Sequence, residues 1–260
     1  MRKLIAGLKI LGLALNCIFA IPFQKIVLLF AKGKAAYFMP QLWHKITCRV
    51  LGLKFEVIGK PETKKQVFFV GNHLSHFDIF ILGSLIRASF VAKEELAHWP
   101  LIGTLSRLQQ TAFISRSAGQ AAKVRNNVQG MIDNGRNIIL FPEGTSTRGD
   151  TVLDFKSTLF SLPLQYADKG LYIQPFTLRL ISVDGKPASS PALKDLYAWD
   201  RDNTIEIGPH IWNFAQTRGA TLQVIFHPLV AITPGEDRKA LAKRIYEIVA
   251  APLEQSVVAV

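Results

Sequence analysis

The sequence predicts an α/β protein with a mixed, largely parallel sheet that is flanked by helices and preceded by an apolar helical segment. From about residue 60 onward, short β-type runs alternate with helical stretches, the pattern of a sheet covered by helices. Polar clusters directly follow two of the β-type runs, "NHLSHFD" after "VFFVG" and "PEGTS" after "IILF", and functional residues in such folds gather at strand ends. With 260 residues, 49% of them hydrophobic, the chain can also bury a large core.

The N-terminal segment 1–58 is predicted to form basic, apolar helices that anchor the protein to a membrane. Residues 1–60 contain ten Lys or Arg and one acid, Glu56, which gives +9 of the net charge of +12. Cations interleaved with runs such as "LIAGLKILGLALNCIFAIPF" fit an anionic lipid surface, whereas nucleic acid favours aromatic residues in an exposed basic stripe. Lys9 interrupts the apolar run and Pro22 ends it, so we expect an in-plane or re-entrant anchor, with a single span as the alternative.

The remainder, residues 59–260, is predicted to be one domain on the cytosolic side of the membrane. Two cysteines, Cys17 and Cys48, make no disulfide framework in a chain of this length, which fits a reducing compartment. The N-terminus resembles a signal peptide, but cleavage after Ala20 would need a small residue at position −3, and Ile18 occupies that position.

Each element of this domain follows from a local pattern. Apolar β-type runs predict strands at 66–72, 89–95, 111–116, 136–144, 171–182 and 220–230. Stretches of helical period predict helices at 77–86, 100–109, 119–134, 155–167 and 237–255. The strand at 136–144 must stop at Pro142, because proline has no N–H to donate to a neighbouring strand.

The first polar cluster places His73 five residues before Asp78. A loop that turns into a helix between them can bring the imidazole and the carboxylate together. A carboxylate that fixes one ring nitrogen leaves the other to act as a base toward a hydroxyl. Two other interpretations stay open, because Ser75 and Asp78 have the S-x-x-D spacing of a helix capping box, and His73, His76 and Asp78 are ligand types for zinc. No further His or Cys is spaced to complete a zinc site, so we expect no metal.

The second polar cluster, "FPEGTSTRGD", contains Glu143, seventy residues after His73. The combination of N-H-x-x-x-x-D with F-P-E-G-T resembles the glycerolipid acyltransferase family that includes bacterial 1-acylglycerol-3-phosphate acyltransferase. The segments "AFISRS", with Arg116, and "YIQPFTL", with Pro175, match two weaker blocks of the family in the same order. The resemblance covers about residues 65 to 180. It implies transfer of a fatty acyl group from a thioester of acyl carrier protein or coenzyme A to the free hydroxyl of a lysophospholipid.

The resemblance also implies roles for single residues. His73 is the general base and Asp78 its orienting partner. The residues expected to bind substrate are Arg116, Glu143, Gly144, Thr145, Arg148 and Lys156. The sequence contains no G-x-S-x-G nucleophile motif, so we expect direct attack by the acceptor's hydroxyl and no cofactor besides the acyl-CoA or acyl-ACP co-substrate.

The chain departs from the family pattern at Ser146, where many lysophosphatidate acyltransferases have Arg directly after E-G-T. We expect 1-acyl-sn-glycerol-3-phosphate as the acceptor, which gives phosphatidic acid. The missing cation leaves another lysolipid, such as a lyso-ornithine lipid, as the alternative. A non-catalytic membrane-surface binding protein is the alternative of another class. The expected partners are membrane lipids, the lysolipid and the acyl thioester, at the cytoplasmic face of a bacterial inner membrane.

Overall fold

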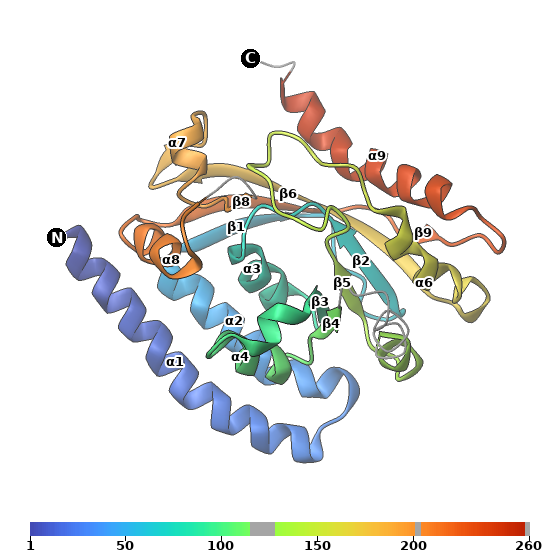
Figure 1. The fold of residues 1–260 in the computed structure, drawn as a ribbon, viewed down its shortest axis with the longest axis horizontal. Helices are drawn as coiled ribbons and strands as arrows, with labels where there is room; N and C mark the ends of the chain where they lie inside the picture. Colours follow the sequence, from blue (N-terminus) through green and yellow to red (C-terminus); the bar gives the residue numbers. More distant parts are fainter. Residues whose placement is uncertain (115–127, 201–203, 258–260) are drawn as a thin grey trace.

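The computed structural model describes residues 1–114, 128–200 and 204–257. Two helices, α1 (Arg2–Phe30) and α2 (Phe38–Leu51), open the chain and pack side by side, with α1 on the outside of the molecule (Figure 1). After α2, Gly52 adopts a left-handed conformation with φ of +79° and lies directly against the backbone of Arg218, where a side chain has no room. This turn leads the chain into its first strand.

In the described part of the chain, a nine-stranded sheet forms the centre of the molecule, with a main path in the order β1-β8-β6-β2-β5-β3-β4. The pairing of β6 with β8 is antiparallel, and every other pairing along this path is parallel. Two short strands, β7 and β9, pair antiparallel with β6. The mixed, largely parallel sheet predicted from the sequence is therefore confirmed. The strands are β1 (Leu53–Ile58), β2 (Val67–Gly71), β3 (Ser89–Lys93), β4 (Ala112–Ile114), β5 (Ile138–Leu140), β6 (Tyr172–Val183), β7 (Lys186–Pro187), β8 (Ala220–Phe226) and β9 (Val230–Ala231).

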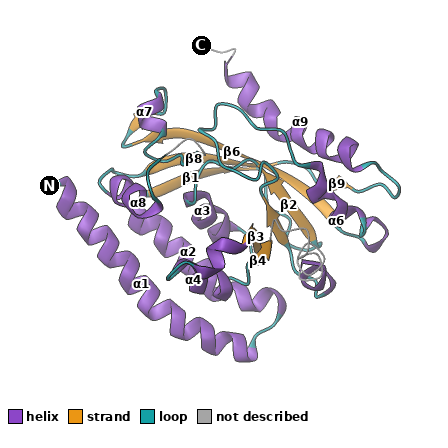
Figure 2. Ribbon diagram, viewed as in Figure 1, coloured by secondary structure: helices purple, strands orange, loops and turns teal. Residues whose placement is uncertain are grey.

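Helices cover both faces of the sheet (Figure 2). β2 is buried along its whole length, and its side chains alternate between two cores. Val67 and Phe69 join the core that includes α2, α3 and α8, whereas Phe68 and Val70 join the core beneath α9. A strand buried on both faces reads as a continuous apolar run, which is why "VFFVG" contains no polar side chain. Further α-helices of the described residues are α3 (Phe77–Leu85), α4 (Ile102–Leu108), α6 (Ser161–Leu164), α7 (Pro191–Lys194), α8 (Ile207–Ala215) and α9 (Arg238–Val257).

The structure differs from the sequence-based element assignment in a few places. The helix predicted at 119–134 falls partly outside the described residues, and 128–133 are helical. The stretch 155–167 forms two short helical pieces, Ser157–Phe160 and α6. The sequence analysis did not predict α7, α8 or β1. Because β1 pairs with β8, residues 53–58 belong to the sheet, although they lie in the segment assigned to the anchor. The division into residues 1–58 and 59–260 stays a prediction.

Candidate active site

The first polar cluster forms a tight loop between β2 and α3. His73 lies two residues beyond the end of β2, and Asp78 is the second residue of α3. The turn brings the side chains together, with His73 Nδ1 2.8 Å from Asp78 Oδ2. A carboxylate only accepts hydrogen bonds, so Nδ1 carries the proton and Nε2 is the nitrogen that can act as a base. The ring stacks on Phe141 with centroids 4.1 Å apart, and 20% of the His73 side chain stays exposed.

Asp78 is fully buried, and its carboxylate accepts four hydrogen bonds. Oδ2 binds His73 Nδ1 and the backbone N–H groups of Leu74 (2.6 Å) and Ser75 (3.0 Å). Oδ1 accepts the hydroxyl of Tyr197 at 2.7 Å. The capping interpretation is thus part of the same arrangement, because one carboxylate ties the loop backbone and orients the imidazole. Burial and the charge of Asp78 hold the pKa of Tyr197 well above its ordinary value, which keeps the hydroxyl a donor.

Glu143, in the second motif, binds the backbone of the His73 loop. Its Oε1 accepts the N–H of His73 and its Oε2 accepts the N–H of Leu153, both at 2.8 Å. Thr147 N in turn donates to His73 O at 2.9 Å. The motifs meet because β2 and β5 are parallel neighbours whose C-terminal ends lie at the same edge of the sheet. Burial raises the pKa of Glu143 to about 7, against the opposing effect of the two N–H groups and His73.

The residues on either side of His73 are fixed by further elements. Asn72 is buried and binds the backbone of Leu178 in β6 twice, with Nδ2 2.9 Å from its carbonyl oxygen and Oδ1 2.7 Å from its nitrogen. The backbone N–H of Trp199 donates to Leu74 O at 2.9 Å. The loop is therefore held by β6, by the second motif and by the segment that follows α7. Sequence analysis quoted Asn72 as part of the motif but assigned it no role.

Gly144 and Lys156 lie against one another in the second motif. Gly144 has φ of +70°, a left-handed conformation that suits glycine, and a side chain there would collide with Lys156 Nζ. The ammonium group of Lys156 therefore lies directly on this turn. Thr145 is half-buried beside it. Arg116, which was also predicted to bind substrate, lies outside the described residues.

Arg148 is paired with two carboxylates that the sequence did not predict. Its Nε is 2.5 Å from Asp195 Oδ1 and 3.5 Å from Asp200 Oδ2, and its Nη2 is 3.4 Å from Asp195 Oδ2. Ser146, in the position of the family's arginine, donates its hydroxyl to the carbonyl oxygen of Trp199. The second motif thus binds the 195–200 segment through Arg148 and Ser146.

A small polar pocket of about 230 Å³ opens beside this motif. Thr147 and Leu153, two of its lining residues, are the ones whose N–H groups bind His73 O and Glu143. The pocket therefore lies one hydrogen bond away from the His73 loop. Its lining residues, which define the polar pocket below, are Ser146, Thr147, Arg148, Asp150, Thr151, Leu153 and Asp200.

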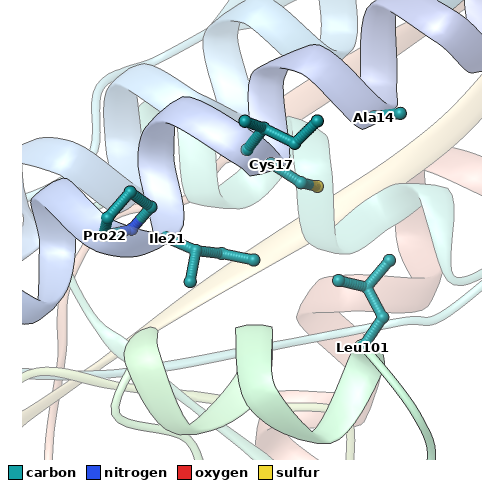
Figure 3. A pocket seen from close by; sticks show the side chains of 6 residues that line it. Ala14, Cys17, Ile21, Pro22 and Leu101 are labelled. Atoms are coloured by element: carbon teal, nitrogen blue, oxygen red, sulfur yellow. The ribbon is translucent and has the colours of Figure 1, made fainter.

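An apolar groove of about 450 Å³ lies elsewhere, between α1 and the residue that precedes α4. Figure 3 shows the side chain of Leu101 facing Cys17 and Ile21 of α1. Leu101 has φ of +60°, an uncommon conformation for a residue with a side chain. The groove contains apolar side chains and none of the predicted site residues.

His76, which the zinc interpretation needed beside His73, packs among aromatic rings. Its ring centroid lies 4.2 Å from that of Phe77, 5.1 Å from that of His210 and 5.7 Å from that of Trp199. Burial lowers the pKa of His76 well below its ordinary value, so the ring is neutral. Among the described residues, no three His, Cys, Asp or Glu side chains are grouped to hold a metal ion.

Comparisons with known proteins agree with the two motifs. Residues 54–179 match the family model described as Acyltransferase. The lyso-ornithine lipid O-acyltransferase of Brucella abortus (strain 2308) is 30% identical over 241 residues, which cover 91% of this chain and 89% of that protein. The protein of the same name from Rhodobacter capsulatus is 34% identical over 200 residues, 76% of this chain and 69% of the relative. A 1-acyl-sn-glycerol-3-phosphate acyltransferase from Neisseria gonorrhoeae is 28% identical over 192 residues, 74% of this chain and 71% of the relative.

One solved structure has a similar fold. The crystal structure of the 1-acyl-sn-glycerophosphate (LPA) acyltransferase PlsC from Thermotoga maritima superposes with a TM-score of 0.67 and 20% sequence identity, over 100% of this chain and 99% of that chain. At this identity the likeness concerns the fold.

Proposed function

Because the chain belongs to the lysolipid acyltransferase family, we propose that it moves a fatty acyl group from an acyl thioester to the free hydroxyl of a lysolipid at a membrane surface. Its relatives are named acyltransferases, which confirms the predicted enzyme class and sets aside the non-catalytic binding protein. The observation that carries the proposed chemistry is the contact of His73 Nδ1 with Asp78 Oδ2. It leaves an oriented imidazole, partly exposed, at the end of a buried strand.

The reaction follows from the free nitrogen of His73. Nε2 takes the proton of the acceptor's hydroxyl while the hydroxyl oxygen bonds to the thioester carbonyl carbon. Asp78 stabilises the positive charge that the imidazole gains. When the carbon–sulfur bond breaks, the imidazolium returns the proton to the leaving thiolate, which gives the acylated lipid and the free thiol of coenzyme A or acyl carrier protein. This route needs no acyl-enzyme and no further cofactor.

We propose a lyso-ornithine lipid as the acceptor, ahead of the 1-acyl-sn-glycerol-3-phosphate that the sequence motifs favoured. The hydroxyl of Ser146 is used by the carbonyl of Trp199, and Arg148 is paired with Asp195 and Asp200. A phosphate monoester carries nearly two negative charges at neutral pH, and two acids beside the cation of this motif suit such a group less well than a headgroup that carries an ammonium group as well. Two relatives named for lyso-ornithine lipid, at 30% and 34% identity, support the same choice.

The outer face of α1 supports membrane attachment. α1 is long and apolar enough to cross a membrane by length and composition. Its large apolar side chains point outward, the reverse of an ordinary surface helix. An exposed apolar surface of this kind, continued by Leu101 across the apolar groove, marks a membrane or protein contact. The exposed large apolar side chains of α1 are Leu4, Ile5, Leu8, Leu11, Leu15, Ile18, Phe19, Phe23, Ile26, Leu29 and Phe30.

The inner face of α1 is polar and binds the protein along the length of the helix. Lys9 Nζ donates to two backbone carbonyls at 2.9 Å, those of Leu51 and Thr217. Asn16 Nδ2 donates to Trp43 O at 3.1 Å, and Gln24 Nε2 donates to two further carbonyls. A helix fastened to the body near both ends supports the in-plane anchor over a span, with the apolar side chains in the lipid. We place the enzyme at the cytoplasmic face of a bacterial inner membrane, which suits its unpaired buried cysteines and its thioester donor.

A variant at His73 tests the proposed reaction. We expect His73→Ala to lower the rate of acyl transfer by about 100- to 10,000-fold, the usual contribution of a general base. The purified protein, in detergent micelles, is incubated with acyl-CoA or acyl-ACP and a panel of lysolipids, and thiol release is followed together with the acylated product. His98→Ala, an exposed histidine in the helical turn Glu94–His98, is the matched control and should keep full activity.

Both variants should bind anionic vesicles as the unaltered protein does, because neither His73 nor His98 belongs to the proposed anchor helix α1. Undiminished thiol release in His73→Ala would refute the assigned base. An unaltered protein that releases no thiol with any lysolipid would refute acyl transfer itself.

A further inference from the structure

We propose that the polar pocket binds the headgroup of the acceptor and selects one that carries both an ammonium and a carboxylate group. The inference rests on the acyl transfer proposed above and names the part of the same site that chooses the acceptor. An amino-acid headgroup such as ornithine has both charges at neutral pH, whereas glycerol phosphate has negative charge alone.

The position of the pocket suits a headgroup site. Thr147, in its wall, donates its backbone N–H to His73 O at 2.9 Å. Leu153, also in the wall, donates to the carboxylate of Glu143, which holds the N–H of His73. A headgroup bound here keeps the rest of the lipid within reach of the imidazole. At about 30 Å³ per water in the liquid, a pocket of about 230 Å³ holds the equivalent of roughly seven waters, the size of a small amino acid.

The charges of the pocket fit a zwitterion better than a phosphate. Among the residues that the structure describes, its wall contains one cation, Arg148, and two acids, Asp150 and Asp200. Behind them, Asp195 pairs with Arg148 and Lys194 pairs with Asp150. These two described cations and three described acids have a net charge of −1. A phosphate monoester, with nearly two negative charges, would enter against this field, whereas an ammonium group is attracted to it.

Asp200 provides the specific contact for the ammonium group. Its Oδ2 lies 3.5 Å from Arg148 Nε, and 12% of its side chain is exposed. Its Oδ1 is shielded from solvent and has no hydrogen-bond partner in the part of the chain that the structure describes. Buried carboxylate oxygens are normally hydrogen-bonded, so an oxygen left without a donor indicates that a donor arrives with the ligand. An ammonium group, with three N–H donors and a positive charge, meets this need.

Ser146 keeps Asp200 in place. Its hydroxyl donates to the carbonyl oxygen of Trp199, the residue before Asp200, and the N–H of Trp199 donates to Leu74 O. The residue that replaces the family's arginine therefore fastens an acidic segment across the motif. Arg148 is the cation that meets the headgroup's carboxylate, by exchange with Asp195, whose side chain is 39% exposed.

Asp200→Asn tests the selection, because it removes the charge and keeps the shape. Steady-state acyl transfer is measured with lyso-ornithine lipid and with 1-acyl-sn-glycerol-3-phosphate, each in mixed micelles. We expect kcat/KM for the lyso-ornithine lipid to fall about 30-fold or more, as on loss of one partner of a buried charge pair, and kcat/KM for the phosphate acceptor to stay equal or rise. Asp168→Asn, an exposed acid away from the pocket, should leave both values unchanged.

A second measurement needs no variant. Free ornithine should inhibit the unaltered enzyme competitively against the lipid acceptor, and glycerol 3-phosphate should inhibit it less. The headgroup proposal is overturned if Asp200→Asn lowers both acceptors equally, if it changes neither, or if glycerol 3-phosphate is the stronger inhibitor. In each of these cases the unaltered enzyme still releases thiol, so acyl transfer stands. Loss of both proposals would show instead as an unaltered protein without activity toward either lipid.

Discussion

Removal of the Tyr197 hydroxyl group tests whether it holds Asp78 in place beside His73. Tyr197 is fully buried and donates to Asp78 Oδ1 at 2.7 Å. A hydrogen bond to a charged group contributes about 1.5–3 kcal/mol, and the carboxylate of Asp78 has no access to water that might replace the lost donor. Three donors remain on Oδ2, so the carboxylate stays in place. We expect Tyr197→Phe to lower the free energy of unfolding by about 2 kcal/mol.

The same change should alter catalysis in a characteristic way. With one donor fewer, the carboxylate of Asp78 is held less firmly and orients the imidazole of His73 less well. The rate of acyl transfer should therefore fall, by less than the roughly 100- to 10,000-fold expected for loss of the base itself. Because Tyr197 is buried behind Asp78, KM for the acceptor should stay unchanged while kcat falls.

Tyr37→Phe is the matched control. Tyr37 is also buried, and its hydroxyl lies 2.6 Å from the hydroxyl of Ser89, a neutral partner remote from the His73 loop in the sequence. Its loss should cost about 1 kcal/mol and leave kcat unchanged. Urea unfolding in detergent, followed by tryptophan fluorescence, and the rate of thiol release measure both effects. If Tyr197→Phe is no less stable than Tyr37→Phe and keeps the unaltered kcat, the hydroxyl does not support the carboxylate.

Two further predictions concern the buried acid and the anchor. Burial raises the pKa of Glu143 to about 7 from an ordinary 4.5, so the folded state keeps a proton that the unfolded state has lost. The free energy of unfolding should be greatest below pH 4.5 and should decline by about 3 kcal/mol as the pH rises to 7 and above. Urea unfolding of Glu143→Gln across the same pH range should lack this decline. An equal decline in both proteins would contradict the raised pKa. On the outer face of α1, Phe19 is 73% exposed, and Phe19→Lys should lower binding to anionic vesicles about 10-fold or more, because a buried phenyl group contributes about 1.5–3 kcal/mol. Val57→Lys, on a strand of the sheet, is the control and should bind the vesicles as the unaltered protein does. If Phe19→Lys also binds them equally well in a sedimentation assay, α1 does not contact the membrane.

The parts of the site that sequence analysis could predict are those set by local geometry or by a motif. His73 and Asp78 are five residues apart, so a single turn decides their contact. Tyr197 is 119 residues from Asp78, and a lone tyrosine has no spacing that would single it out. Arg148 stays a predicted substrate-binding residue, and the acids that pair with it come from residues 195 and 200, which approach it only in the folded chain.

The anchor shows a pattern that was present in the sequence but read differently. Lys9 was taken as an interruption of an apolar run. Lys9, Asn16 and Gln24 are seven and eight residues apart, so they share one face of a helix of 3.6 residues per turn. The structure turns this face toward the protein, where its donors bind backbone carbonyls. The charge of Lys9 is therefore turned away from the outer face, which is mostly apolar along the helix.

The loop that carries His73 is held at nearly every backbone and side-chain polar group by a different part of the chain. Asn72 binds β6, the backbone of His73 binds Glu143 and Thr147, and Leu74 binds Asp78 and the segment after α7. A base fixed to this degree does not need to reorganise during the reaction, so the substrates are the groups that move into position beside it. In the arrangement that we propose, the lysolipid reaches the site from the membrane in which α1 lies, and its headgroup enters a pocket whose wall is bonded to the same loop. The base and the proposed headgroup pocket are joined through the backbone of residues 73 and 147 but are formed by different side chains, so Asp200→Asn should change the acceptor ratio and His73→Ala the rate with every acceptor.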